Sequence, residues 1–259
     1  MTKLPILLSI PHGGTQRPPE LDSHLSITDK DLFDDSDPFV IEIYDLGTKV
    51  ERVIKTNIAR AFVDPNRSLQ DLPPQNSDGL IKSATCYEKP IYKKGSEPDD
   101  SLTTVLIELY YKPYHKSIQK SIHDLDLQLC LDCHSMAAVA PNISPDGNEK
   151  KRPMFCISNQ DGKTSSNEMI ELLASCISES FGIDRNEISL NDPFHGGHIT
   201  KTYGNNPIPW IQVEMNRDLY LSKDWFDVDS LSIDSSRLRK LNQQFENSLN
   251  LFFSKINRN

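Results

Sequence analysis

The fold can be inferred from one stretch, LQLCLDCHS, which spans Leu127–Ser135. Its leucines alternate at positions 127, 129 and 131, and Cys130 extends the apolar run to the opposite face. This pattern is typical of a central β-strand that is buried on both sides. The run stops at an acid, a thiol, an imidazole and a hydroxyl. Open α/β sheets bind ligands at the carboxyl ends of such strands, so we expect a functional site here.

Within this stretch, Asp132 and His134 share one face, because residues two apart in a strand point the same way, and Cys133 points to the other. That arrangement suits metal ligands or a base, and it is a poor one for a Cys–His nucleophile pair. A purely structural strand end, whose imidazole caps a neighbouring carbonyl, explains the stretch equally well on its own.

Composition limits the class of protein. The chain has 259 residues, of which 37% are hydrophobic, enough for one α/β domain or two small ones. Its formal charge of −9 argues against nucleic acid or an anionic membrane as a partner, although an anionic small substrate remains compatible with local arginines. No apolar stretch reaches transmembrane length, and the run Leu4–Ile10 is too short for a signal peptide. We therefore expect a cytoplasmic protein.

The cysteines indicate free thiols. There are five, an odd number, and only Cys130 and Cys133 form a CxxC pair. Because these two lie on opposite faces of one strand, neither a zinc knuckle nor a redox motif is expected.

A second histidine occupies an equivalent position. Leu4–Ile10 reads as a buried strand that opens into the loop Pro11-His12-Gly13-Gly14. His12 therefore follows the end of a buried strand, as His134 does.

The remaining pattern alternates strands and helices. Strands are expected at Val53–Thr56, Met154–Ile157, Ile188–Asn191 and Pro209–Met215, and helices at Leu102–Leu125, Asn167–Phe181 and Ser236–Ile256. Pro113 should kink or restart the first of these helices. Such alternation predicts an α/β fold, with a mostly parallel sheet and helices on both faces. The stretch Leu69–Asp100 has no sustained period and could form a lid over a site.

Three further stretches carry candidate residues, each with a structural alternative. Asp37 ends an acidic cluster (Asp31, Asp34, Asp35, Asp37), and with Pro38 it is either the N-cap of a helix that extends through Val50 or a carboxylate ligand. Arg60, Asn66 and Arg67 could clamp a carboxylate or phosphate, or the arginines could pair with Asp64. Glu214, on the polar face of a strand with Gln212 and Asn216, is a general acid/base candidate or simply pairs with Arg217.

Together these residues indicate a metal-assisted amide hydrolase that acts on a carboxylate-bearing substrate. Zinc held by three protein ligands lowers the pKa of its bound water to about 7. A base and a group facing the oxyanion complete the chemical requirements.

The same motifs, in the same order, resemble the N-formylglutamate amidohydrolase family. The matching stretches are SIPHGG (9–14), DDSDPF (34–39), RAFVDPNR (60–67), KPIYKKG (89–95), PYH (113–115), DCHS (132–135), GGHIT (196–200) and IQVEMNRDLY (211–220). The resemblance runs from residue 5 to about residue 221. It implies a single catalytic domain over 1–259 and a three-layer fold like that of zinc carboxypeptidases and the aspartoacylase group, with a central mixed sheet.

The resemblance also implies a metal site. His12 and His134 match the metal-binding histidines, and Asp37 is the best match for the carboxylate ligand of zinc or another divalent metal. The wider zinc group has a glutamate three residues after the first histidine, where this chain has Thr15. Asp35 therefore stays open as an alternative third ligand.

The remaining roles follow from the same resemblance. Arg60 would face the oxyanion, Asn66 and Arg67 would hold the substrate carboxylate, and Arg217 would help to orient or bind the substrate. Glu214 would act as general base and then as general acid. The implied reaction is hydrolysis of N-formyl-L-glutamate, or a similar N-acyl acidic amino acid, to formate and glutamate, in histidine degradation or in a relative with a changed substrate. A carboxypeptidase-like or cell-wall amidohydrolase and a non-catalytic carboxylate-binding protein remain alternatives, and the oligomeric state is open.

Overall fold

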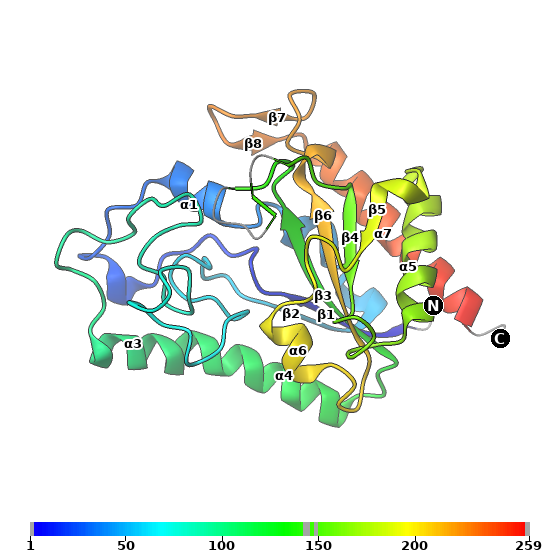
Figure 1. Cartoon of the computed structure of the whole chain (residues 1–259), viewed down its shortest axis with the longest axis horizontal. Helices are drawn as coiled ribbons and strands as arrows, with labels where there is room; N and C mark the ends of the chain where they lie inside the picture. The colour runs from blue at the N-terminus through cyan, green and yellow to red at the C-terminus, as the bar shows by residue number, and fades with distance from the viewer. Residues whose placement is uncertain (1–2, 142–145, 148–149, 257–259) are drawn as a thin grey trace.

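A six-stranded sheet forms the centre of the protein (Figure 1). The computed structural model describes residues 3–141, 146–147 and 150–256. The strands lie in the order β2-β1-β3-β6-β4-β5. Their bounds are β1 Leu4–Ile10, β2 Val50–Lys55, β3 Leu129–Met136, β4 Phe155–Ser158, β5 Ile188–Leu190 and β6 Trp210–Asn216.

The sheet is mixed and mostly parallel. β2, β1, β3 and β6 run parallel to one another, whereas β4 pairs antiparallel with β6 and parallel with β5. Every residue of β3 is buried, as the apolar run in the sequence predicted for a central strand. Leu131 and Cys133 face one hydrophobic cluster, and Cys130 faces another across the sheet.

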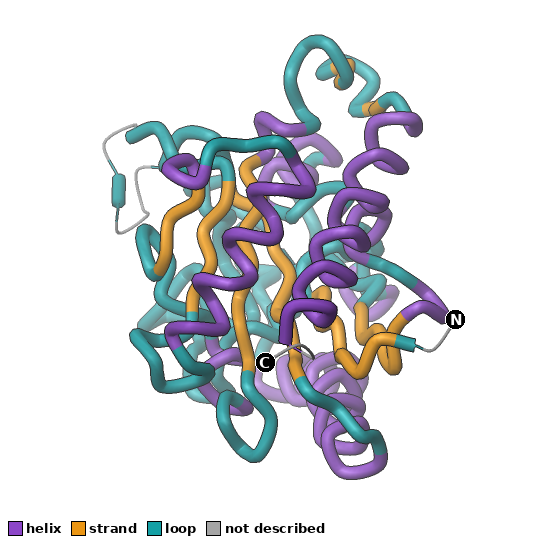
Figure 2. The backbone as a smooth tube through the Cα atoms, turned by 90° about the vertical axis from the view of Figure 1, so that its right-hand side faces the viewer, coloured by secondary structure: helices purple, strands orange, loops and turns teal. Residues whose placement is uncertain are grey.

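Helices cover both faces of the sheet, so the predicted α/β class is confirmed. On one face lie α2 (Val40–Tyr44), α5 (Asn167–Phe181) and α7 (Ser235–Ile256), which share the larger cluster with the strands. Figure 2, viewed from the side of α5 and α7, shows helices in front of the strands, where they cover this face of the sheet. On the other face, α4 (Lys112–Asp124) and α6 (His198–Tyr203) pack against the sheet through Tyr114, Ile118 and Tyr203.

A separate lobe lies beside the sheet, at the left of Figure 1. It contains α1 (Asp29–Asp35), α3 (Asp100–Leu106) and the long excursion between β2 and α3, where the only pairing found among the described residues is in isolated bridges. Phe62, Leu80, Ile91 and Leu106 belong to its own hydrophobic cluster. The absence of regular structure predicted after Leu69 is therefore confirmed, and a lid function stays a prediction.

The long helix predicted before β3 is interrupted as expected. A π-helical turn, Ile107–Tyr111, separates α3 from α4, and Pro113 lies in the first turn of α4. Proline is tolerated in the first turn of a helix, but it has no N–H to donate and its ring collides with the carbonyl four residues earlier. A regular α-helix therefore cannot continue unbroken from α3 through this position.

Two predictions near residue 40 are wrong. Asp37 is not an N-cap, because α2 begins at Val40 with Phe39 as its cap residue, at φ 62°. The helix also ends at Tyr44 and does not continue to Val50, which starts β2 instead. Upstream, the acidic residues 31, 34 and 35 lie in α1, whose N-cap is the Thr28 side chain.

Smaller elements complete the described chain. Gly182, at φ 66°, ends α5 in the left-handed conformation that glycine favours. A short hairpin pairs β7 (Phe226–Asp227) with β8 (Ser232–Ile233). 3-10 turns span Pro19–Leu21, Gly47–Lys49, Arg185–Glu187 and Arg217–Leu219. Among the described residues, no helix is both long enough and apolar enough to cross a membrane.

Candidate active site

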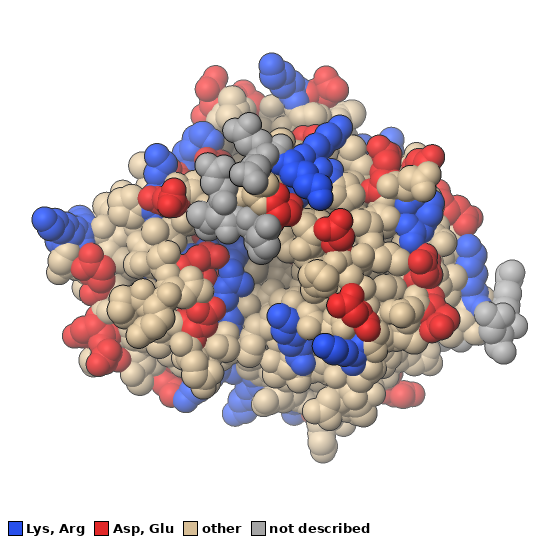
Figure 3. Space-filling model, viewed as in Figure 1, with Lys and Arg blue, Asp and Glu red and all other residues tan. Residues whose placement is uncertain are grey.

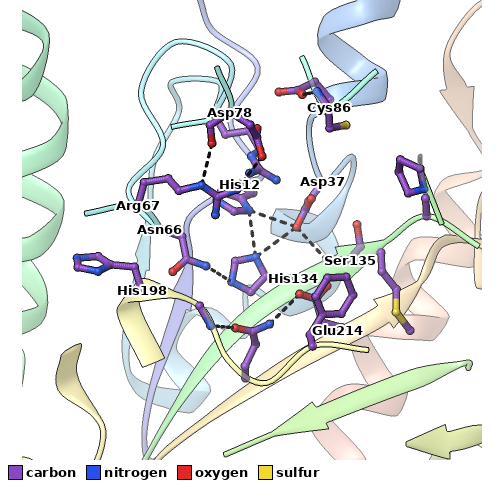
Figure 4. Close-up of a pocket in the computed structure, with 18 of the residues that line it drawn as sticks. His12, Asp37, Asn66, Arg67, Asp78, Cys86, His134, Ser135, His198 and Glu214 are labelled. Carbon is purple, nitrogen blue, oxygen red and sulfur yellow. Dashed lines mark hydrogen bonds and ion pairs between the residues drawn. The ribbon is translucent and has the colours of Figure 1, made fainter. Parts of the chain in front are cut away.

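Sheet register brings the candidate residues to one edge. β1 pairs with β3 at Ser9 and Asp132, so the loop after β1 carries His12 to the end of β3. β3 in turn pairs with β6, which places His134 opposite Glu214. The carboxyl ends of neighbouring parallel strands meet at the same edge, as the fold class predicts. Figure 4 shows His12, His134 and Glu214 gathered there.

The spacing of three buried side chains suits a tetrahedral metal ion. The Nδ1 atoms of His12 and His134 lie 3.1 Å apart. Asp37 Oδ2 lies 3.7 Å from the first of these nitrogens and 3.4 Å from the second. Ligands about 2.0–2.1 Å from a tetrahedral zinc ion are separated from one another by about 3.3 Å. His12, Asp37 and His134 are therefore a possible metal-binding group.

Carboxylates hold the far nitrogens of both imidazoles. His12 Nε2 lies 2.7 Å from Asp64 Oδ1, and His134 Nε2 lies 3.2 Å from Asp132 Oδ2. A carboxylate on one ring nitrogen orients the other nitrogen toward a metal and raises its basicity. Asp132 is fixed by Ser9 Oγ, which donates to it at 3.2 Å, and by Thr200 Oγ1 at 3.1 Å.

Asp37 is held by both of its oxygens. Oδ2 accepts a hydrogen bond from the Ser135 backbone N–H at 2.9 Å, and Oδ1 accepts one from Arg217 Nη2 at 3.1 Å. Burial raises the pKa of Asp37, but hydrogen bonds with the two histidines and the charge of Arg217 outweigh burial and lower it well below its ordinary value. Asp37 is therefore anionic, as a ligand must be.

The alternative carboxylate, Asp35, lies elsewhere. Lys82 Nζ donates to its two oxygens at 3.1 and 3.0 Å, and the Cys86 N–H donates to Oδ1 at 2.7 Å. The structure thus brings Asp37, and not Asp35, to the histidines.

The donor set fits a divalent cation electrostatically. Four buried carboxylates (Asp37, Asp64, Asp132 and Glu214) surround the two imidazoles. Burial lowers the pKa of His134, yet Asp132, Asp37 and Glu214 raise it well above its ordinary value. Negative charge that stabilises a protonated imidazole at this position would also stabilise a metal cation. Two nitrogens and one carboxylate oxygen are ligands that zinc accepts.

Glu214 has the properties of a general base near neutral pH. Gln212 Nε2 donates to its Oε1 at 2.9 Å, and the Gln212 amide oxygen accepts from the Gly197 N–H. Burial raises the pKa of Glu214 to about 7, with His134 opposing the rise and Asp37 adding to it. A carboxylate with this pKa can both accept and return a proton at neutral pH.

These groups line a cavity of about 590 Å³. Figure 3 shows this face of the molecule hollowed near its middle, with acidic and basic side chains at the margin. Arg60 and Arg67 both line the cavity, and each is paired with an acid: Arg60 Nη2 lies 2.6 Å from Asp64 Oδ2, and Arg67 Nη2 lies 2.8 Å from Asp78 Oδ2.

The other two predicted substrate residues make contacts within the site. Asn66 Oδ1 accepts from the Ile199 N–H at 2.8 Å, and its Nδ2 lies 3.2 Å from His134 Nε2. Arg217 contacts Asp37 and also donates through Nη2 to the Ser36 carbonyl at 2.6 Å. Both side chains therefore touch the metal-binding group directly.

Several residues of the site were not predicted from the sequence. Asp64 was noted only as a partner of arginine, although it lies inside the motif RAFVDPNR and so could have been found. Asp78 and Lys82 lie in the excursion without periodicity, which carries no local signal. Arg152 is buried in the cavity wall with its guanidinium 4.9 Å from the Phe194 ring, at the end of the loop that follows β3, and no motif in the sequence singled it out. Within that loop, 142–145 and 148–149 fall outside the described residues.

Comparisons with known proteins identify the family of this chain. The family model for N-formylglutamate amidohydrolase matches residues 4–221. The N-formylglutamate deformylase of Pseudomonas putida is 26% identical over 230 residues, which cover 85% of this chain and 83% of that protein. The corresponding enzyme of Pseudomonas aeruginosa is 25% identical over 230 residues, 85% of this chain and 84% of that protein.

The fold is also that of a solved relative. The crystal structure of N-formylglutamate amidohydrolase from Ralstonia eutropha JMP134 superposes with a TM-score of 0.81 at 20% identity, covering 97% of this chain and 94% of that one. The family match spans most of the chain and contains each of the metal-binding candidates, Glu214 and the arginines. This chain belongs to the N-formylglutamate amidohydrolase family.

Proposed function

We propose that the protein hydrolyses the formyl amide of N-formyl-L-glutamate, or of a closely similar N-acyl acidic amino acid, to formate and the free amino acid. The observation that carries the proposal is the position of Glu214, whose pKa is raised to about 7. It lies opposite His134 and therefore beside the His12–Asp37–His134 group. Family membership and the names of the two Pseudomonas relatives support the substrate. A cytoplasmic role in histidine degradation stays a prediction from the sequence.

His12, Asp37 and His134 would hold a zinc ion, because their spacing and charge fit one. When bound, such an ion supplies Lewis-acid chemistry, polarising a carbonyl and acidifying a water molecule. Three protein ligands are the usual number in catalytic zinc sites.

Glu214 carries the proton in the proposed reaction. Its carboxylate removes a proton from the water that attacks the formyl carbon. The C–N bond then breaks, and Glu214 returns that proton to the departing amine nitrogen, which regenerates the carboxylate. Gln212 holds the Glu214 carboxylate through its Oε1, so the second oxygen, Oε2, is the one we assign to proton transfer.

The arginines bind negative charge in this proposal. Arg60 uses Nε and Nη2 for Asp64, and its remaining Nη1 would face the oxyanion that develops on the formyl oxygen. Arg67 would bind a substrate carboxylate. Asn66 would help Arg67 to hold that carboxylate, and Arg217 would help to orient or bind the substrate. The contacts of Asn66 with His134 and of Arg217 with Asp37 add a role in holding the metal-binding group.

The test is formate release from N-formyl-L-glutamate together with metal analysis of the purified protein. We expect about one zinc per chain, and loss of both metal and formate release in His134→Ala. A matched control is His123→Ala, because the side chain of His123 is exposed on α4. A panel of N-acetyl amino acids and peptides separates the deformylase from a carboxypeptidase-like enzyme. A metal-loaded protein that releases no formate from N-formyl-L-glutamate would refute the proposed substrate.

A further inference from the structure

Among the described residues, Asp78 accepts the hydrogen bonds that orient the Arg67 guanidinium. Arg67 Nε donates to the Asp78 carbonyl at 2.9 Å, and Arg67 Nη2 donates to the Asp78 carboxylate at 2.8 Å. Figure 4 shows the two side chains together at the cavity wall. Because two points of contact fix a planar group, the direction of the guanidinium is determined by Asp78.

Asp78 is in turn fixed from behind by a buried lysine. Its Oδ1 lies 2.5 Å from Lys82 Nζ, and the side chain of Lys82 is fully buried. The same ammonium group contacts Asp35, which also accepts the Cys86 N–H. A buried cation is tolerated only when carboxylates surround it, so this arrangement cannot rearrange at low cost. Lys82, Asp35 and Asp78 thus form a rigid support for Arg67.

No other described acid can replace Asp78 in this role. Asp71 approaches Arg67 Nε only to 3.8 Å, and its carboxylate accepts a hydrogen bond from Asn76 at 2.7 Å instead. Tyr111 holds the Arg67 backbone carbonyl at 3.0 Å but leaves the side chain free to turn. The contacts with Asp78 occupy Nε and one N–H of Nη2, and Nη1 remains for a ligand in the cavity that Arg67 lines.

We propose that Asp78, supported by the buried Lys82, is the positioning residue that directs the Arg67 guanidinium toward the carboxylate of the substrate. The inference rests on the proposed function, which assigns Arg67 to that carboxylate. It gives the irregular segment between β2 and α3 a specific part in substrate recognition.

Positioning and simple electrostatics predict opposite effects for Asp78. Burial raises its pKa, but Lys82, Arg60 and Arg67 lower it to about 2, so the residue carries a negative charge at neutral pH. If only net charge mattered, removing this anion from an anion-binding cavity would tighten substrate binding. If Asp78 positions Arg67, removing it weakens binding. The sign of the change in KM therefore distinguishes the two.

The experiment is a double-mutant cycle of Asp78→Ala and Arg67→Ala in the metal-loaded enzyme, with kcat and KM for N-formyl-L-glutamate. We expect Asp78→Ala to raise KM about 10-fold or more, the scale of a lost charged hydrogen bond, and to change kcat by less than about 3-fold. If Asp78 acts through Arg67, the double variant should be no worse than Arg67→Ala alone.

A second pair of variants tests whether a rise in KM in Asp78→Ala results from misfolding. Asp78→Asn keeps the size of the side chain and one acceptor oxygen. We therefore expect its KM to lie between the KM of the wild type and that of Asp78→Ala. The matched control Asp71→Asn, a similar change in the same segment, should leave KM within about 2-fold, because its contact with Arg67 is long. Thermal unfolding of each variant confirms the folded state.

The outcomes separate this inference from the proposed function. An unchanged or lowered KM in both Asp78 variants, or single effects that multiply in the double variant, would overturn it. If the wild type binds N-formyl-L-glutamate without hydrolysing it, calorimetry measures Kd for each variant of the double-mutant cycle. Changes in Kd that follow the pattern expected for KM would support the inference, although the proposed function fails. A wild type that neither binds nor hydrolyses this compound overturns both.

Discussion

His134 and Glu214 are directly opposed in the register of the adjacent parallel strands β3 and β6. Adjacent strands lie about 4.8 Å apart, so a metal-binding imidazole and a proton-transferring carboxylate are neighbours by virtue of the sheet alone. A shift of β6 by one residue would turn Glu214 to the opposite face and replace it with an apolar side chain. The burial of both faces of β6 prevents such a shift.

Glu214→Gln should keep the metal and lose turnover. The amide has nearly the same size but cannot accept the proton of water, so kcat should fall by roughly 10² or more, the usual scale for general base catalysis. Metal content and formate release measure the two effects. Glu171→Gln is the control, because this glutamate is exposed on α5. Near-normal turnover in Glu214→Gln would remove Glu214 from the mechanism.

Activity should fall on the acidic side of neutrality. The pKa of Glu214 is raised to about 7, and only its deprotonated form can act as a base, so kcat/KM should increase with pH through that region. A bound cation stabilises the carboxylate, which places the midpoint at or below 7. A pH profile of kcat/KM gives the midpoint. If the residual activity of Glu214→Gln falls at acidic pH with the same midpoint as the wild type, a group other than Glu214 is responsible for the decrease.

Asp132→Asn should weaken metal binding through His134. Loss of the carboxylate on Nε2 removes the group that orients the imidazole, and such substitutions usually cost 10- to 100-fold in metal affinity, so we expect about that range here. Competition with a chelator measures the affinity. Asp161→Asn is a matched control, because Asp161 also pairs with a histidine, His195, but both of these side chains are exposed. Equal affinities in the two variants would contradict the assignment.

Lys82→Met should destabilise the fold in a pH-dependent way. It leaves the carboxylates of Asp35 and Asp78 without their shared cation, and breaking a buried ion pair costs about 3 kcal/mol in the free energy of unfolding. The pKa of each of these acids is lowered in the folded state, so the ion pairs stabilise the protein above the ordinary value of 3.8 and less as the pH falls below it.

Urea unfolding at pH 7 and pH 3 measures this effect. The loss of stability in Lys82→Met should be larger at pH 7, and the exposed Lys240→Met on α7 should cost little at either pH. A loss that is the same at both values would mean that packing, and not charge, accounts for the role of Lys82.

Much of the fold could be predicted because local periodicity reports burial. The alternation around Leu129 and Leu131 identified the central strand, and the period of Asn167–Phe181 gave α5 with both of its ends. The failure near Asp37 has a specific cause. The Asp-Pro pair has the local form of a helix start, yet Ser135 and Arg217, far along the chain, bind the Asp37 carboxylate, and α2 starts later.

The sequence by itself determined that two histidines follow buried strands and that Glu214 lies on the polar face of another, because strand period and strand ends are local properties. Only the tertiary structure decided which acid joins the histidines. Asp35 and Asp37 are two residues apart, but Lys82 binds the first and Arg217 the second. A buried charge needs a partner, and which partner reaches it depends on segments that meet only when the chain has folded.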